Sequence, residues 1–382
     1  MSSDSQQNLK HLIACWALAL LGAMPVAIQP FFLRVMSDAL TLQSDQIGLL
    51  ASADILGAVV ASFSGVWWLK RFDLPSVVRI AQVSILLGYI GLIFVDSFET
   101  VLALRFLSGL FGHGIAFALG TALLCRTANP DRSIAISVVT QIVFSAVLLL
   151  VLPQVLAVTG DQISFIFLVA IVAMILPLIR GLTYEAGKTP TSFKVASYQP
   201  TALLLAALIF YQIGLSAIWA FIEPLASERA FSLQETGSML AVILPVSMVG
   251  SIAAAVLNLR VGRLLPACIA TLGAAIGLFI LEQTNLLTLF AVGFLVHQIA
   301  WNFGIAFFYG AVADTAMDSG TEILAPGCQA LGSAIGPIIA GVFAANYGLS
   351  SVIWVSIAGM VVGSIILICS QSTHFKESFS KE

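Results

Sequence analysis

Charged residues are scarce in this sequence. Only 9% of its 382 residues are Asp, Glu, Lys or Arg, whereas a soluble globular domain carries about 25%. Hydrophobic residues make up 59% of the chain, so too few polar side chains remain to cover a core in water. This scarcity excludes an ordinary soluble domain and predicts that the lipid bilayer is the main solvent.

Basic residues are few as well. The 16 Lys and Arg residues are outnumbered by 19 Asp and Glu residues, which gives a formal net charge of -3, and they form no cluster along the chain. A nucleic-acid interface needs a concentrated basic surface. We therefore expect no nucleic-acid partner.

The sequence also lacks the usual signatures of metal sites, cofactors and catalysis. No two of its five cysteines have the spacing of a redox pair or a zinc site, so we expect free, buried thiols and no metal. It contains no nucleophile elbow, no HExxH and no phosphate-binding glycine loop. We expect neither an enzyme nor a cofactor, and the energy source would be an ion gradient or the substrate's own gradient. The cysteines are Cys15, Cys125, Cys268, Cys328 and Cys369.

Apolar runs of a length that spans a bilayer, about 20 residues, recur along nearly the whole chain. The first run begins near Leu12 and continues past Val26, so we expect a retained helix there and not a cleaved signal peptide. The predicted helices are 9–35, 45–69, 76–95, 99–125, 133–157, 163–182, 201–226, 235–258, 264–283, 286–312, 322–345 and 350–370.

The basic residues predict the orientation of these twelve helices. With an even number of spans both termini share a side, and thirteen of the sixteen basic residues then fall on that side. Arg34 and Arg229 fall on the opposite side, and Arg105 lies inside a span. By the positive-inside rule we expect cytoplasmic termini, and we expect the bacterial inner membrane as the location.

The two halves of the chain resemble each other. Residues 40–50 (LTLQSDQIGLL) parallel residues 231–240 (FSLQETGSML), and a polar stretch with Lys188 and Pro190 separates the halves. We therefore predict an N-terminal six-helix bundle over 1–182, a cytoplasmic linker over 183–200 and a C-terminal six-helix bundle over 201–382. Chance similarity among apolar sequences is the alternative.

Two motifs resemble those of the major facilitator superfamily. GSAIGPIIAG at 332–341 fits the pattern G-x-x-x-G-P-x-x-x-G of its helices 5 and 11, and RFLSGLFGHG at 105–114 resembles its helix 4 motif. Helix 5 of this chain keeps only Pro153 of the pattern. The resemblance implies an all-α membrane protein of two pseudo-symmetric six-helix bundles. Small residues let helix backbones approach closely, and we assign helix packing to Gly109, Gly112, Gly332, Gly336, Pro337 and Gly341.

The family's loop signature is only partly present. A leucine, Leu69 or Leu259, stands in the acidic position of each copy. The basic loops would either latch the cytoplasmic side of the two halves or only set the topology, and both interpretations stay open. The residues that match the signature are Lys70, Arg71, Arg260, Gly262 and Arg263.

Arg105 is a cation inside the predicted helix 4. By membrane insertion scales, the free-energy cost of placing an arginine inside a span is about 2.5–3.5 kcal/mol. Asp54 of helix 2 lies at a similar depth, so we predict that the two side chains pair. The pair would either couple proton or substrate movement, or only fix the packing of the helices.

Other polar residues lie deep in predicted spans. In helix 7, the spacings of four, three and four between Gln212, Ser216, Trp219 and Glu223 put these residues on one face, which cannot look at lipid. In helix 10, a similar stripe consists of Gln298, Asn302 and Tyr309. The resemblance implies that helices 1, 4, 7 and 10 surround a central cavity. The predicted substrate and proton pathway consists of Asp54, Arg105, His113, Gln141, Gln212, Trp219, Glu223, His297, Trp301, Asn302, Tyr309 and Gln329. Ordinary packing is the alternative for the tryptophans, and structural hydrogen bonding is the alternative for the histidines.

The sequence therefore predicts a secondary active transporter. We expect a monomer in the bilayer that moves a small organic solute by alternating access with proton coupling, and the aromatic pathway residues favour efflux. The first alternative is a proton symporter or uniporter that imports a sugar or organic acid, with Arg105 as the anion-binding group. The second, from another class, is a membrane receptor or scaffold that transports nothing.

Overall fold

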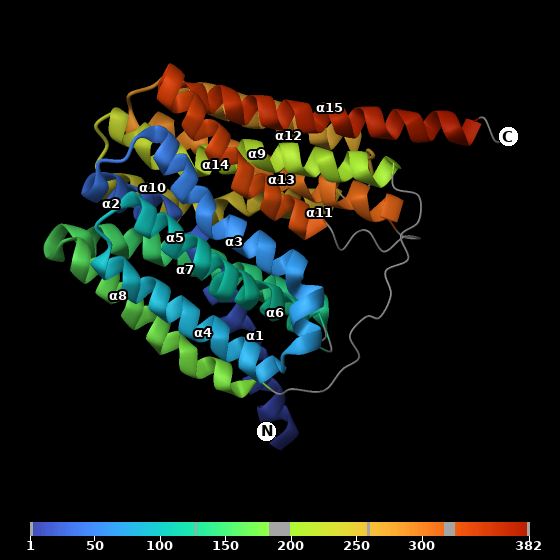
Figure 1. Cartoon of the computed structure of the whole chain (residues 1–382). Helices are drawn as coiled ribbons and strands as arrows, with labels where there is room; N and C mark the ends of the chain where they lie inside the picture. Colours follow the sequence, from blue (N-terminus) through green and yellow to red (C-terminus); the bar gives the residue numbers. More distant parts are fainter. Residues whose placement is uncertain are drawn as a thin grey trace. The chain divides into compact units, whose positions relative to one another are not determined.

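The computed structural model describes residues 3–125, 127, 129–182, 199–257, 260–316 and 325–379, and within them it contains helices and no strand (Figure 1). The helices of the N-terminal half are α1 (Ser3–Ala27), α2 (Gln29–Leu40), α3 (Ser44–Arg71), α4 (Leu74–Gly91), α5 (Phe98–Ser108), α6 (Gly114–Leu124), α7 (Pro130–Thr159) and α8 (Asp161–Ile175). Those that follow are α9 (Gln199–Glu228), α10 (Leu233–Ser247), α11 (Val249–Leu257), α12 (Leu264–Glu282), α13 (Leu287–Ala316), α14 (Ala325–Tyr347) and α15 (Ser351–Phe379).

The described residues contain twelve helical spans that are long and apolar enough to cross a membrane, which confirms the predicted number. They run from Asn8–Ala27, the first, to Ser351–Ser370, the last. Their bounds lie within a few residues of the predicted ones except in the first span. Residues 183–198 of the predicted linker 183–200 lie outside the described residues.

Three predicted helices are interrupted near residues that weaken a helix, and the third and sixth end in 3-10 turns over Leu92–Phe94 and Leu176–Gly181. The first breaks at Ile28, just before Pro30 occupies the opening turn of α2. The eighth breaks at Met248, three residues after Pro245, which has no backbone N–H to donate. The fourth changes to a π-helix over Gly109–His113.

By contact density the chain forms two compact units. The first consists of Met1–Leu42, Leu49–Gly187 and Leu233–Ala241, and the second of Gln43–Gly48, Lys188–Ser232 and Val242–Glu382. The first unit thus includes the start of α10, and the second unit includes the start of α3. The division of the chain into bundles over 1–182 and 201–382 stays a prediction.

The first unit is held together by helices that approach at glycine. A Cβ atom at Gly120 of α6 would lie 2.6 Å from the backbone N of Ala19 in α1, and one at Gly22 would overlap the backbone of Phe117. Between apolar helices in lipid, association depends on van der Waals contact and not on the release of water. Glycine at these crossings permits that contact.

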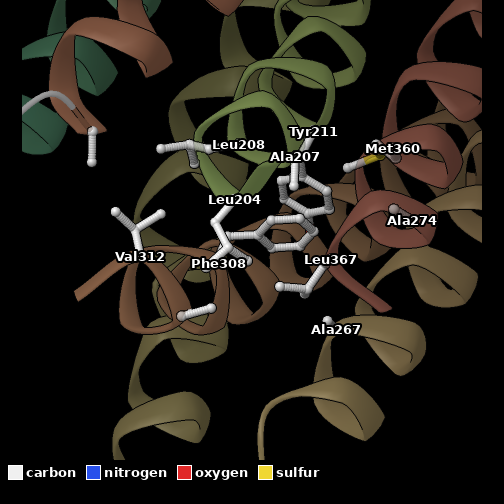
Figure 2. Close-up of a cluster of buried hydrophobic side chains, with 12 residues drawn as sticks. Leu204, Ala207, Leu208, Tyr211, Ala267, Ala274, Phe308, Val312, Met360 and Leu367 are labelled. Carbon is white, nitrogen blue, oxygen red and sulfur yellow. The ribbon is translucent and has the colours of Figure 1, made fainter. Parts of the chain in front are cut away.

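The second unit has its core between α9, α12, α13 and α15. Tyr211 of α9 stacks on Phe308 of α13 with ring centroids 4.2 Å apart and an angle of 25° between the rings (Figure 2). On the other side of α9, a Cβ at Gly332 of α14 would lie 2.5 Å from the carbonyl oxygen of Ile209. Gly336 comes equally close to Ile213, so the two glycines let α14 pack tightly on α9.

The remaining members of the helix 11 motif also lie at close contacts within the second unit. A Cβ at Gly341 would be 2.6 Å from the carbonyl oxygen of Ser44 in the first turn of α3. The carbonyl oxygen of Pro337 occupies the space beside Gly48. The packing role predicted for Gly332, Gly336, Pro337 and Gly341 agrees with these contacts.

The prediction of buried thiols is wrong for most of the cysteines, although all five are free. Cys15 is buried and Cys328 is partly buried, but Cys125, Cys268 and Cys369 are exposed on the outside of the protein. Apolar sequence indicates burial in the membrane, and it does not separate a side chain that faces lipid from one that faces another helix.

Candidate functional site

The first unit contains a buried carboxylate. Oδ2 of Asp54, on α3, is 3.2 Å from Nη2 of Arg105 on α5 and 2.9 Å from Nδ1 of His113. At most 5% of each of the three side chains is exposed. The predicted pairing of Asp54 with Arg105 is confirmed, and His113 joins the pair.

The π-helical segment Gly109–His113 explains how Arg105 and His113 reach the same oxygen. The two residues are eight positions apart, so on an uninterrupted α-helix their side chains would point about 80° apart around the axis. A π-turn accommodates one extra residue, which brings the two directions to within about 20° of each other. The segment therefore acts as a register shift that places both side chains on Asp54.

The glycines of the helix 4 motif bring this segment against α3. A Cβ at Gly109 would overlap the carbonyl oxygen of Asp54, and one at Gly114 would lie 2.5 Å from Cα of Ala58. Gly57 of α3 approaches the backbone of α5 in the same way. Gly112 faces Ile85 of α4, where a Cβ would lie 2.9 Å from Cγ1. The predicted packing role of Gly109 and Gly112 agrees with these contacts.

Aromatic rings enclose the charged groups. The guanidinium carbon of Arg105 lies 4.7 Å from the centre of the Phe32 ring on α2, a cation–π distance. The ring edge of Tyr89, on α4, meets the His113 ring at a centroid distance of 5.7 Å. The apolar walls strengthen the attraction between carboxylate and guanidinium and make removal of either partner unfavourable.

A small pocket opens beside the ion pair. Its volume is about 10 Å³, close to the ~10–15 Å³ that one water molecule requires. Gln29 of α2 lies on its wall and donates a 2.8 Å hydrogen bond to the carbonyl oxygen of Ala51. The pocket can admit a water molecule or a proton to the carboxylate, and it is too small for an organic solute. Its lining residues are Pro25, Gln29, Phe32, Leu50, Ala51, Asp54, Ile55 and Arg105.

The second unit contains a chain of uncharged polar side chains. Tyr309 of α13 donates a short hydrogen bond to Oε1 of Gln329 on α14, whose Nε2 donates across 3.3 Å to Oε1 of Gln212 on α9. Nε2 of Gln212 in turn donates to Oγ of Ser333 across 2.9 Å. Gln212, Tyr309 and Gln329 all belong to the predicted pathway, and the structure brings them together. Ser333 was not predicted.

The predicted face of helix 7 is buried throughout. Gln212, Ser216, Trp219 and Glu223 are each less than 10% exposed, which confirms that this face does not look at lipid. Trp219 stacks on Phe294 at a centroid distance of 6.4 Å, and Phe294 stacks on His297 at 6.0 Å. Trp219 and His297, two residues of the predicted pathway, therefore pack inside the protein.

The predicted stripe on helix 10 divides between two neighbours. Asn302 donates to Oγ of Ser247 at 3.1 Å, at the end of α10, whereas Tyr309 bonds to Gln329 of α14. Trp301 lies against the core of the second unit, and its indole N–H makes no hydrogen bond to any described residue. Gln141 of α7 donates to Ser137 of its own helix at 3.0 Å.

The cytoplasmic loop motif is described in part. Gly262 has φ +72°, a left-handed conformation that glycine adopts without strain. The guanidinium of Arg263 lies on Gly310 of α13 in the space that a Cβ would fill. Arg71 and Arg260 are exposed, and the side chain of Lys70 lies outside the described residues. A latch role for this motif stays a prediction.

The described residues contain no group of three or more His, Cys, Asp and Glu side chains that could hold a metal ion. The contacts of Phe32, Tyr89 and Gln29 were not predicted. The one signal for Gln29 in the sequence is that the pair Gln29-Pro30 parallels Glu223-Pro224 in the second half.

Known proteins resemble this chain in sequence pattern and in fold. The family model described as Major Facilitator Superfamily matches residues 15–325. The nucleoside transporter NupG is 12% identical with a TM-score of 0.77, over 95% of this chain and 99% of that chain. A bacterial homolog of the human lysosomal transporter Spinster, in an inward-facing and occupied conformation, is 14% identical with a TM-score of 0.75, over 98% and 99%.

A third solved structure, the xylose transporter XylE from E. coli in a partially occluded inward-open conformation, is 12% identical with a TM-score of 0.68. It matches over 94% of this chain and 98% of that chain. No curated protein sequence matches this chain significantly. Identities this low show a shared fold and carry no information on the solute.

Proposed function

The chain belongs to the major facilitator superfamily and is an integral, multi-pass membrane protein, and we propose that it couples proton binding at Asp54 to the transport of a small organic solute. The family match and the fold support transport by alternating access, in which two bundles rock around a central site. The observation that carries the coupling is the position of Asp54, buried between Arg105 and His113 beside a water-sized pocket.

The chemistry of this position suits a proton-controlled switch. While Asp54 is ionised, its charge is balanced by Arg105, and α3 and α5 are held together. Protonation of the carboxylate leaves the guanidinium buried without its counter-ion, an arrangement that is disfavoured by about 3–5 kcal/mol in buried pairs. The proton therefore changes the relative stability of conformations that differ in how these helices pack.

The second unit supports an uncharged solute with hydrogen-bonding groups. Gln212, Gln329 and Tyr309 present amide and hydroxyl groups and no formal charge. Such a set recognises hydroxyl, amide or heterocyclic groups and disfavours a bare ion, which would leave water without compensation.

Export is the first proposed direction, because the aromatic side chains of Trp301 and Tyr309 are only partly buried and favour an amphipathic solute. The second candidate is proton symport of a polar metabolite, and the amide chain favours it. Trp219 does not help the case for export, because it stacks on Phe294 within the protein. A monomer in the bacterial inner membrane with cytoplasmic termini completes the proposal.

The test is solute flux into proteoliposomes under an imposed pH gradient. A panel of labelled nucleosides, pentoses, organic acids and amphipathic amines would be compared between the wild-type protein and Asp54→Asn. We expect gradient-driven flux of one class in the wild type and its loss in the variant. Asp38→Asn is the matched control, because Asp38 is an exposed partner of Arg34 on α2. Undiminished gradient-driven flux in Asp54→Asn would overturn the proposal.

A further inference from the structure

Of the two partners of Asp54, His113 is the one whose side chain can both accept and release a proton, because arginine keeps its proton in proteins. Its Nδ1 atom lies 2.9 Å from Oδ2 of Asp54. Its other ring nitrogen, Nε2, is buried and makes no hydrogen bond to any described residue. The ring therefore has one nitrogen committed to the carboxylate and one nitrogen open.

The carboxylate determines which nitrogen holds the hydrogen. An ionised Asp54 can only accept hydrogen bonds, so the contact with Nδ1 requires a hydrogen on Nδ1. A neutral ring then has a free lone pair on Nε2. The histidine is thus held in the tautomer in which Nε2 can accept a proton.

The two approaches to Asp54 lie on opposite sides of it along α3. On α3 the pocket is lined by Leu50 and Ala51, which precede Asp54, by Asp54 itself and by Ile55, and it does not reach Ala58 or His113. His113 is adjacent to Gly114, which packs on Ala58, one turn or about 6 Å beyond Asp54. The carboxylate therefore lies between a water-sized pocket and the imidazole.

The His113 ring has few charged or titratable neighbours. The charged and titratable side chains that face it are Asp54 of α3, Arg105 of α5 and Tyr89 of α4. α6 packs on the same segment and contains no titratable residue, and α1, which also packs on it, has none after Cys15. Arginine does not release its proton in proteins.

We propose that His113 is a second proton carrier, which passes a proton between Asp54 and the side of the bundle beyond the pocket. This role rests on the proposed proton coupling at Asp54. In the step, a proton binds Nε2 as the N–H bond at Nδ1 breaks and an O–H bond forms at Oδ2 of Asp54. One proton is taken up, the imidazole ends neutral with its hydrogen on Nε2, and the carboxylate ends as a neutral acid. The reverse step releases the proton.

The step has a spectroscopic signature that a purely structural histidine would not show. The sequence contains four histidines, so a nitrogen-15 histidine spectrum of the full chain in lipid bilayers is simple to assign. We expect one histidine with its hydrogen on Nδ1 at neutral pH, and we expect the hydrogen to move to Nε2 as the sample is acidified. His113→Gln identifies the signal by removing it, and His297→Gln is the control that removes another.

Flux measurements separate the relay from the coupling itself. His113→Asn keeps a side-chain N–H near the position of Nδ1 but has no second nitrogen to accept a proton. We expect it to slow gradient-driven flux by about tenfold or more, since general acid–base groups typically contribute 10²–10⁴-fold. A His113 hydrogen fixed on Nε2 at all pH values, or wild-type flux in His113→Asn with no flux in Asp54→Asn, would overturn the relay alone. Wild-type flux in both variants would overturn the coupling as well.

Discussion

Nδ1 of His113 lies 2.9 Å from Oδ2 of Asp54, although the two residues are 59 positions apart and lie in different helices. The contact exists because a π-helical segment turns His113 onto the face that Arg105 already occupies. A local irregularity of one helix therefore determines the composition of the buried charge cluster.

The ion pair predicts strong non-additivity between its members. Arg105→Leu leaves Asp54 without its cation, and the variant should lose about 3–5 kcal/mol of stability, as is typical when one partner of a buried pair is removed. Asp54→Leu combined with Arg105→Leu should recover much of that loss. Thermal unfolding of wild type, Arg105→Leu, Asp54→Leu and the double variant in detergent gives the coupling energy. Additive losses in the double variant would contradict a direct pair.

The register shift predicts an unusual tolerance to deletion. Phe111 lies within the π segment and is exposed on the outside of the protein. Without it the segment can close as an α-helix, and Arg105 and His113, then seven positions apart, would still lie within about 20° of each other. We expect this deletion variant to fold and to keep the Nδ1-bound hydrogen of His113 at neutral pH. Loss of that signal in a folded variant would show that the bulge has another role.

The crossing of α3 and α5 predicts that Gly109 cannot be enlarged. The Cβ of an alanine at this position would overlap the carbonyl oxygen of Asp54, so Gly109→Ala must push the two helices apart. We expect a large loss of thermal stability and loss of gradient-driven flux. Gly65→Ala on α3 is the matched control, because its Cβ would meet Trp68 at an ordinary 3.6 Å. Equal stability of the two variants would contradict the close approach.

The amide chain of the second unit predicts an effect on solute binding and none on proton binding. Gln329→Leu removes the acceptor of Tyr309 and the donor to Gln212. In the proposed function this amide also bonds the solute, and the loss of one neutral hydrogen bond worth about 0.5–1.5 kcal/mol should raise the KM for the solute by roughly two- to tenfold. Asn346→Leu, at an exposed site of α14, is the control. An unchanged KM in Gln329→Leu would place the solute elsewhere.

Asp73, outside the membrane spans, predicts a pH dependence of stability. Its carboxylate accepts hydrogen bonds from the side chain and from the backbone N–H of Ser76 at the start of α4, and these bonds lower the pKa of the carboxyl. A lowered pKa in the folded state stabilises the protein above the carboxyl's ordinary pKa of about 3.9, and the benefit disappears as the pH falls through the folded value. Asp73→Ala should therefore melt earlier than wild type at neutral pH, and the difference should shrink in acid. A constant difference in Tm across this range would contradict the cap.

The sequence predicted the partners of Arg105 only in part, for a physical reason. A buried cation needs an anion at the same depth, so Asp54 could be identified from its position in the next span. His113 could not be placed in the same cluster, because ordinary helical periodicity directs it about 80° away from Arg105. The register shift depends on how Gly109 and Gly114 pack on α3, which is a tertiary property.

Helix count and packing motifs were predictable because apolar length and small residues act locally. The contacts of polar residues on a span were less predictable. The face of Gln212 and Glu223 was correctly predicted to be buried, since the spacing fixes which residues share a face. Which neighbour that face meets depends on the arrangement of helices, so Asn302 and Tyr309, expected on one stripe, bond to different helices.

The most direct test of the central claim is proton movement driven by the solute alone. Proteoliposomes loaded with a pH-sensitive dye and held without a pH gradient would receive the solute identified in the flux panel, with wild-type, Asp54→Asn and Asp38→Asn proteins compared. The account predicts a solute-dependent change in internal pH for wild type and Asp38→Asn, and none for Asp54→Asn. A change of the same size in Asp54→Asn would show that the coupled proton binds elsewhere.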